Sequence, residues 1–241
     1  MIRNLFFDLD DTLLDFRKSE HDALAKTLRA AGIPVTEALL TRYAEINAGY
    51  WKRLERQEVT RDALKVLRFR DLFAEIGTDN PDPAAICAAY ECRLGQQHHL
   101  IDGASETLRN LCKNYRLFAA SNGTGSIQRS RLAGAGIADL FSGLLISEEL
   151  GASKPAKAFF DACFARFPDL KLKRSETAII GDSLTSDIAG GHAAGLLTVW
   201  FNPARSENRT AIRPDAEITA LRELYEGEIL GALSQSQSPT V

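Results

Sequence analysis

The chain has little cysteine, little charge imbalance and no long apolar run. Four cysteines occur among 241 residues without a Cys-x-x-Cys pair, so neither a disulfide framework nor a thiolate metal site is expected. A net charge of -3 provides no broad basic surface for duplex nucleic acid or an anionic membrane. No segment approaches the roughly 20 apolar residues that a transmembrane helix needs, and no cationic start precedes a long apolar stretch. We therefore expect a soluble, cytoplasmic protein with reduced, structural thiols.

The second half of the chain alternates apolar strand patterns with helical ones. Strands are predicted over 115–120, 144–146, 177–180 and 197–200, and the apolar start of the chain predicts one more. Strands that alternate with helices are typical of a mostly parallel sheet covered by helices on both faces. The fold class is therefore α/β.

A long helical segment interrupts this pattern after the first strand. Residues 16–97 are rich in Ala, Leu, Arg and Glu, with Thr36 and Thr60 placed to cap two of the helices and a break over 78–83. We expect an all-helical cap domain there, inserted into a catalytic core of residues 1–15 and 98–230. The polar end of the chain, 231–241, is predicted to be a disordered tail.

Carboxylates follow the first predicted strand abruptly. Residues 8–12 read Asp-Leu-Asp-Asp-Thr after the apolar segment that ends at Phe7. In extended geometry Asp8 and Asp10 point to one face, and like charges this close are costly unless a cation relieves them. A hard divalent ion, Mg²⁺, fits such oxygen ligands. The alternative is that these short polar residues only form a turn or a helix cap.

Two later segments suit phosphate binding. Ser121, Asn122 and Gly123 follow a predicted strand and offer a hydroxyl, an amide and accessible backbone N–H groups. Lys154 precedes Pro155, which is placed to begin a helix, and its ammonium can neutralise phosphate charge. Taken alone, the first segment is more simply an ordinary strand–helix loop with Ser126 as a cap, and a lone lysine is more often a solvated surface residue.

A second acidic segment follows another buried strand pattern. Residues 181–187 read Gly-Asp-Ser-Leu-Thr-Ser-Asp, and Asp182 can supply a second carboxylate to the metal. Asp187 can bind a metal-coordinated water or orient Lys154. Its alternative role is that of a first-turn acid favoured by the helix dipole.

In their order along the chain, these four segments resemble the motifs of the haloacid dehalogenase-like phosphatase superfamily. The resemblance covers residues 1 to about 205 and implies a Rossmann-like core with a helical cap. It implies that Asp8 is the nucleophile and Asp10 the general acid and base. Mg²⁺ would be held by Asp8, the backbone carbonyl of Asp10 and Asp182, while Ser121 and Lys154 would bind the phosphoryl group. An acid at position 10 argues against the dehalogenase members.

Two smaller features resemble the pyrimidine 5'-nucleotidase branch of this family. They are residues 11–16, Asp-Thr-Leu-Leu-Asp-Phe, and residues 200–203, Trp-Phe-Asn-Pro. Phe16 can stack a base, and so can Tyr43, Tyr50 and Trp51, although aromatics at helical spacing more often form a core.

We therefore expect a magnesium-dependent nucleotidase acting on a small phosphorylated metabolite, as a monomer or small homo-oligomer. A sugar-phosphate or phosphoglycolate-type phosphatase, and a phosphomutase, are the enzymatic alternatives. A phosphorylated receiver domain or a binding module without turnover are the alternatives from other classes.

Overall fold

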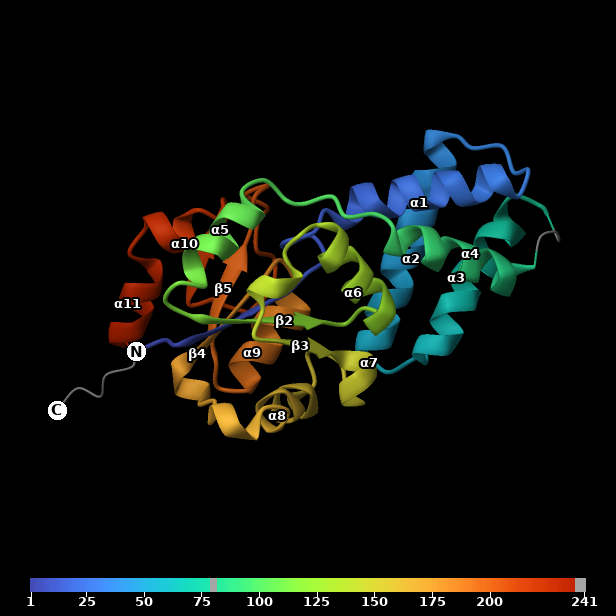
Figure 1. Cartoon of the computed structure of the whole chain (residues 1–241). Coiled ribbons are helices and arrows are strands. Elements are labelled where there is room, and N and C mark those ends of the chain that lie inside the picture. The colour runs from blue at the N-terminus through green and yellow to red at the C-terminus, as the bar shows by residue number, and fades with distance from the viewer. Residues whose placement is uncertain (79–81, 237–241) are drawn as a thin grey trace. The chain divides into compact units, whose positions relative to one another are not determined.

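The computed structural model describes residues 1–78 and 82–236 (Figure 1). Within these residues six strands form one sheet in the order β3-β2-β1-β4-β5-β6, and every neighbouring pair is parallel. The strands are β1 (Asn4–Phe7), β2 (Arg116–Ser121), β3 (Gly143–Ile146), β4 (Thr177–Gly181), β5 (Leu197–Phe201) and β6 (Ala216–Ile218). The predicted α/β class is confirmed, and the three-residue β6 is the strand that its sequence pattern did not reveal.

The first strand lies in the middle of the sheet. The chain goes from β1 to β2 and β3 on one side, and then crosses to β4, β5 and β6 on the other. Ligands of open α/β sheets bind at such a reversal, outside the carboxyl ends of the strands. Phe7 lies level with Ala119 and Ile180, so these three strands end within two residues of one another at the same edge of the sheet.

Helices cover both faces of the sheet. In Figure 1, α8 and α9 lie on one side and α5 and α10 on the other. Large apolar side chains fill the interior, and the rings of Phe6 and Phe118 meet edge to face with centroids 5.5 Å apart. The helices of this part are α5 (Ala104–Leu111), α7 (Ser147–Leu150), α8 (Lys157–Ala165), α9 (Ala189–Ala193), α10 (Glu223–Glu226) and α11 (Ile229–Ser236). No described helix is long and apolar enough to cross a bilayer.

The chain separates into two compact units. The first contains Met1–Asp15, Leu100–Gly125 and the chain from Ala135 onward, and the second contains Phe16–His99 and Ser126–Gly134. The second unit is all-helical: α1 (Phe16–Ala30), α2 (Glu37–Glu55), α3 (Arg61–Glu75), α4 (Pro83–Gly95) and most of α6 (Gly125–Gly134). The expected boundaries of core and cap stay predictions, and the grouping of α6 with the inserted helices differs from them.

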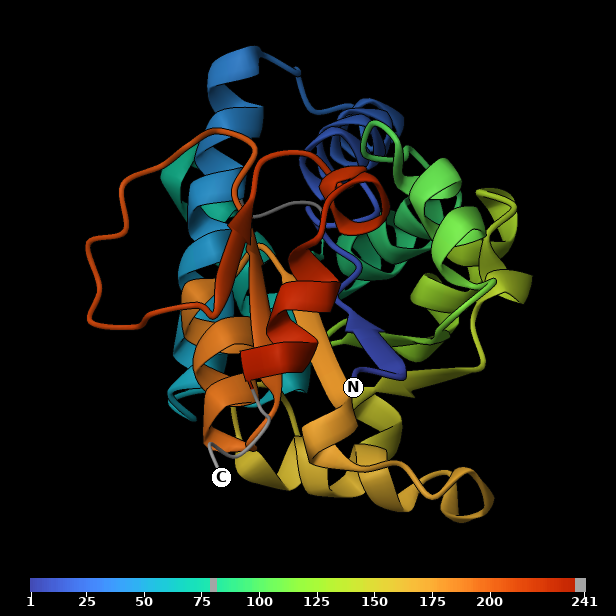
Figure 2. The same ribbon diagram turned by 90° about the vertical axis from the view of Figure 1, so that its left-hand side faces the viewer.

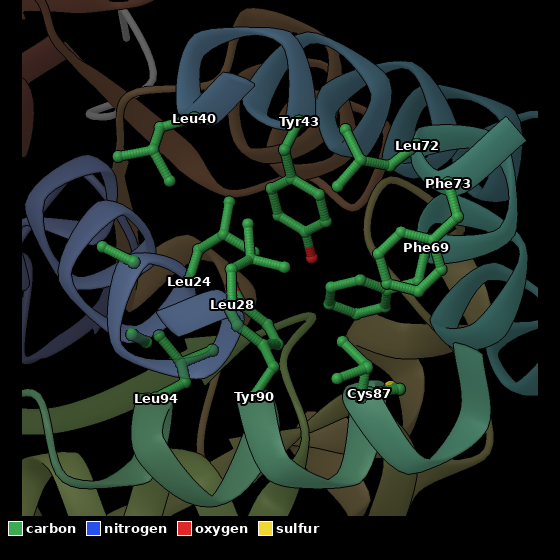
Figure 3. Close-up of a cluster of buried hydrophobic side chains, with 13 residues drawn as sticks. Leu24, Leu28, Leu40, Tyr43, Phe69, Leu72, Phe73, Cys87, Tyr90 and Leu94 are labelled. Carbon is green, nitrogen blue, oxygen red and sulfur yellow. The ribbon is translucent and has the colours of Figure 1, made fainter. Parts of the chain in front are cut away.

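The inserted helices have a hydrophobic core of their own (Figure 3). The rings of Tyr43, Phe69 and Tyr90 pack together there, and all three side chains are fully buried. Thr36 and Thr60 cap α2 and α3 as predicted, since each side chain accepts a hydrogen bond from the backbone N–H three residues on. Residues 79–81 of the predicted break lie outside the described residues.

Two local expectations differ from the structure. Pro155 does not begin a helix, because the chain first makes a turn and α8 starts at Lys157. Residues 231–236 of the predicted tail continue α11, and 237–241 lie outside the described residues. Leu230 and Leu233 are buried, and the backbone N–H of Ile2 donates to Ser234 Oγ at 3.0 Å. These contacts hold the last helix beside the start of the chain (Figures 1 and 2).

Candidate active site

Three carboxylates meet at the carboxyl edge of the sheet. Asp8 follows β1 and Asp182 follows β4, while Asp187 lies in a one-turn π-helix, η4 (Leu184–Ile188). One carboxylate oxygen from each of the three lies within 4.8 Å of the others. Residues more than 170 positions apart in sequence therefore form one group. It lies at the edge of the sheet where the sequence predicts a metal site.

Lys154 lies against this group and is almost completely buried. Its ammonium donates to Asp8 Oδ1 at 2.6 Å, to Asp187 Oδ1 at 2.7 Å and to the carbonyl of Ala120 at 2.6 Å. A lysine has three N–H donors, and all three have acceptors here. At 2% exposure this side chain is not the solvated surface residue of the alternative interpretation.

The charges around Lys154 do not balance. Burial raises the pKa of Asp8, and the carboxylates of Asp187, Asp182 and Asp10 raise it further, while Lys154 lowers it; the net shift is well upward. Burial alone would lower the pKa of the Lys154 ammonium, but its carboxylate partners outweigh this effect and the pKa is raised. One buried cation therefore faces several carboxylates, which is an arrangement that a second cation stabilises.

Asp182 is the second carboxylate of the candidate metal site. Burial and then the charges of Asp187 and Asp11 raise its pKa to about 8. Thr12, which is fully buried, holds it at two points: the Asp182 N–H donates to Thr12 Oγ1 at 3.0 Å, and that hydroxyl donates to Asp182 Oδ1 at 3.3 Å. The sequence reading did not single out Thr12, since a threonine among carboxylates carries no signal of its own.

Both oxygens of Asp187 are engaged within the protein. Oδ1 accepts from Lys154, and Oδ2 accepts from the Ser183 N–H at 3.1 Å. A Cβ on Gly181 would lie only 2.2 Å from Asp187 Oδ2, so glycine is required where this carboxylate folds back over the strand end. These contacts are the ones expected of a carboxylate that orients Lys154, while its other predicted role, binding a metal-coordinated water, stays a prediction.

The predicted phosphate loop lies beside Lys154. The Gly123 N–H donates to Ser121 Oγ at 3.0 Å, which closes a tight turn at the end of β2. Asn122 exchanges two hydrogen bonds with the backbone of Lys154: its Nδ2 donates to the carbonyl at 2.9 Å, and its Oδ1 accepts from the N–H at 2.8 Å. The Asn122 side chain thus ties the second segment to the third, and its predicted contact with substrate stays a prediction.

Asp10 belongs to a tight loop at the end of β1. The carbonyl of Leu9 accepts from the N–H groups of Leu13 and Leu14, and Asp11 takes a left-handed backbone with φ of 60°. Asp10 itself is half-buried, and its charge contributes to the raised pKa of Asp8. The loop therefore brings a second, more accessible carboxylate close to the first.

The aromatic residues considered for base stacking lie in the second unit. Phe16 begins α1 and packs against the core of that unit. Tyr43 is fully buried among apolar side chains, which is the structural role expected for most of these aromatics, and the Tyr50 hydroxyl donates to Asp71 at 2.5 Å. The stacking role of Phe16 stays a prediction.

The donor set of the site fits magnesium. It consists of hard carboxylate oxygens in excess of the one buried cation. The pKa values of Asp8 and Asp182 are raised first by burial and then by the neighbouring carboxylates, although Lys154 lowers both, which is the result expected where carboxylates outnumber the cations beside them.

Comparison with known proteins agrees with this geometry. Residues 2–195 match the family model of the haloacid dehalogenase-like hydrolases. The HAD-hydrolase YfnB of Bacillus subtilis is 40% identical over 92% of this chain and 94% of its own. Its crystal structure, bound to magnesium, superposes with a TM-score of 0.88 at 39% identity, covering 93% of this chain and 97% of that one.

Two further relatives have names that state an activity. The pyrimidine 5'-nucleotidase PynA of Streptococcus pneumoniae is 36% identical over 92% of this chain and 93% of its own. The pyrimidine 5'-nucleotidase YjjG of Escherichia coli is 30% identical over 91% of this chain and 95% of its own. The four segments, their meeting at one sheet edge and these matches lead to one conclusion: the chain belongs to the haloacid dehalogenase-like hydrolase family.

Proposed function

We propose that this protein is a magnesium-dependent phosphomonoesterase that works through a phosphorylated Asp8 and acts on pyrimidine nucleoside 5'-monophosphates. The observation that carries the proposal is the 2.6 Å contact of Lys154 with Asp8, inside a group of three carboxylates. A carboxylate aimed at a phosphate dianion is repelled unless positive charge lies beside both. Lys154 supplies part of that charge from a fixed position.

The carboxylates of Asp8 and Asp182 and the backbone carbonyl of Asp10 are the proposed magnesium ligands. When bound, the ion supplies positive charge against the phosphate and the carboxylates. Asp187 serves this site indirectly, because its oxygens hold Lys154 and the Ser183 N–H.

Asp8 and Asp10 divide the chemistry between them. Asp8 forms a bond to phosphorus while the bond from phosphorus to the leaving oxygen breaks, and protonated Asp10 donates its proton to that oxygen. In the second step a water oxygen bonds to phosphorus, the Asp8–phosphorus bond breaks, and Asp10 takes a proton from the water. The sum is a phosphate ester plus water giving an alcohol plus phosphate.

The remaining contacts of the phosphoryl group come from two segments beside Asp8. Ser121 ends β2 and, with the backbone N–H groups of the turn that it closes with Gly123, offers donors to phosphate oxygens. Lys154 faces Asp8, so the same ammonium approaches both the nucleophile and the group in transfer.

The choice of a pyrimidine nucleotide rests on the two named nucleotidases, which align over more than nine tenths of this chain. In this proposal the core residues contact the phosphate, so the leaving group is recognised elsewhere, and Phe16 is our candidate for contact with the base. A small phosphorylated metabolite in the cytoplasm is the partner that this proposal requires.

The test is turnover of a panel of phosphate esters with Mg²⁺. We expect pyrimidine nucleoside monophosphates to give the highest kcat/KM, ahead of purine nucleotides, sugar phosphates and phosphoglycolate. Asp8→Asn should lower kcat by about 10³-fold or more, while Asp139→Asn, an exposed carboxylate of the first unit, should leave it unchanged.

Each part of the proposal has its own contrary result. If sugar phosphates were turned over fastest, the nucleotidase assignment would be contradicted, but the assignment as a phosphatase would stand. A strict need for a bisphosphate activator would indicate a phosphomutase. If neither the parent nor Asp8→Asn turned over any of the esters, the assignment of an enzymatic activity would be contradicted.

A further inference from the structure

Three hydrogen bonds hold the backbone on either side of Asp182. Its own N–H donates to Thr12 Oγ1 at 3.0 Å, and the next N–H, that of Ser183, donates to Asp187 Oδ2 at 3.1 Å. Its carbonyl accepts from the indole N–H of Trp200 at 2.8 Å. Because both flanking peptide groups are held, φ and ψ of Asp182 are fixed, and the Thr12 hydroxyl also donates to the carboxylate at Oδ1.

Trp200 reaches this carbonyl from the neighbouring strand. It lies on β5 in register with Gly181, the residue just before Asp182. The residue is 6% exposed, so its ring is packed against its neighbours and its single N–H donor has a fixed direction. The other two hydrogen bonds come from residues of the carboxylate segments themselves, whereas Trp200 comes from outside all four.

We propose that Trp200 is a positioning residue for the metal site, and that its indole N–H presets the Asp182 carboxylate for a divalent cation. This inference rests on the proposed function, because it assigns the cation to Asp182. A group that orients a metal ligand raises the affinity for the metal, because the ligand does not have to reorganise when the metal binds. Removal of such a group typically lowers the affinity for the metal by about 10- to 100-fold.

The alternative is that the hydrogen bond only satisfies a buried indole. A buried donor needs an acceptor whatever lies beyond it, and under this alternative a phenylalanine would cost stability alone. The two roles separate in the affinity for the metal, because a purely packing role leaves that affinity unchanged.

The experiment compares Trp200→Phe with Trp51→Phe, which removes the other tryptophan of the chain from α2 in the second unit. Mg²⁺ is titrated in the absence of substrate, and the rise of Tm gives its apparent Kd. We expect Kd to rise about tenfold in Trp200→Phe and to stay at the parent value in Trp51→Phe. In turnover assays the half-saturating Mg²⁺ should rise by the same factor, with kcat at saturating Mg²⁺ changed much less.

A parent-like Kd in Trp200→Phe would overturn the inference and leave the proposed function standing. Failure of the parent itself to bind Mg²⁺ would instead overturn the metal assignment and the inference together. The two failures are therefore distinguishable.

A second measurement does not depend on the folding of Trp200→Phe. In Trp51→Phe the remaining tryptophan, excited selectively over the five tyrosines, is Trp200, in hydrogen-bond contact with the backbone of Asp182. Its emission should change on addition of Mg²⁺, with the same half-saturation as the Tm shift. Emission that stays constant while Tm rises would show that Trp200 does not sense the metal, and would contradict the inference.

Discussion

Both units bury basic side chains, and two of these, Lys154 and Arg68, are surrounded very differently. Lys154 has two carboxylates and one carbonyl as acceptors. Arg68, in the inserted helices, donates to Asn47 Oδ1 at 2.9 Å and lies over the rings of Phe69 and Tyr90. Around Lys154 negative charge is in excess. Arg68 instead has one carboxylate among the described residues, that of Glu91, at 4.0 Å, and Asn47 stands between Arg68 and the carboxylate of Glu20.

This comparison separates a structural buried charge from a reactive one. A polar group in a core needs partners, and Arg68 has neutral ones together with the carboxylate of Glu91 at 4.0 Å, so its charge is matched without an excess of acid. The carboxylates around Lys154 exceed what one ammonium can neutralise, and folding stability alone does not require three of them there. Such an excess is the signature of a site that binds cations or transfers charged groups.

The largest expected difference between the two buried cations appears when each is replaced by methionine. Lys154→Met should lower kcat by about 10²- to 10³-fold and cost about 3–5 kcal/mol of unfolding free energy, because it leaves Asp8 and Asp187 without their cation. Arg68→Met should cost about 1–3 kcal/mol through its lost hydrogen bonds and leave kcat for a small aryl phosphate unchanged. Steady-state kinetics and denaturant unfolding measure both quantities. A catalytic loss in Arg68→Met as large as that in Lys154→Met would contradict the distinction.

Glycines provide the next contrast. Gly181→Ala places a methyl group onto Asp187 Oδ2 and should lower activity by about 10- to 100-fold by displacing the acceptor of Lys154. Gly49→Ala, within α2 with nothing near its added Cβ, should raise the unfolding free energy by about 0.5–1 kcal/mol at full activity. The pair is measured by kcat at saturating Mg²⁺ and by urea unfolding. Full activity in Gly181→Ala would show that the position of Asp187 does not matter for the chemistry.

In the metal-free protein, the excess of carboxylates should make the unfolding free energy depend on pH. The pKa of Asp182 is raised from 3.8 to about 8, so in metal-free protein the folded state holds a proton that the unfolded state has lost. The unfolding free energy should therefore fall as pH rises from about 4 to about 8. The buried Tyr43 has its pKa raised above 10 and stays neutral over this range, so it adds no such slope.

Mg²⁺ binds the ionised carboxylates, so its effect on Tm should be larger at pH 8 than at pH 5. At about 100 times its Kd the ion contributes about 2.7 kcal/mol, which is about 5–10 °C for a chain of this size. Differential scanning fluorimetry with EDTA or Mg²⁺ at both pH values makes the measurement. An equal Mg²⁺ shift at the two pH values would contradict the raised pKa of Asp182.

Two hydroxyls provide the last contrast. Thr12→Val removes both contacts with Asp182 and should cost about 1–3 kcal/mol, since it leaves a backbone N–H of the site without its acceptor. Among the described residues the buried hydroxyl of Tyr43 has no hydrogen-bond partner, so Tyr43→Phe should be neutral or stabilise by up to about 1 kcal/mol. Chemical unfolding curves for the two variants test this, and a larger loss in Tyr43→Phe would reverse the expected order.

The carboxylate site was predictable from sequence because its residues follow strand patterns. In a parallel sheet the carboxyl ends of neighbouring strands meet at one edge, so Asp8, Ser121 and Asp182 had to approach each other once the strands were assigned. Lys154 follows a turn and not a strand, so it was predicted only because the other three segments accompany it in the sequence.

What the sequence could not show is contact between neighbouring segments. The hydrogen bonds of Thr12 and Trp200 to Asp182 depend on strand register, which no local pattern encodes. The grouping of α6 with the inserted helices, and the burial of Leu233 in what had been expected to be a tail, depend likewise on tertiary packing.

The most direct test of the account is to trap the phosphorylated protein. Acid quenching during turnover with Mg²⁺, followed by digestion and mass spectrometry, should find one phosphoryl group on the peptide that contains Asp8, and none in Asp8→Asn. Steady turnover with no phosphorylated peptide, or with the phosphoryl group on another residue, would contradict the central claim that Asp8 is the nucleophile.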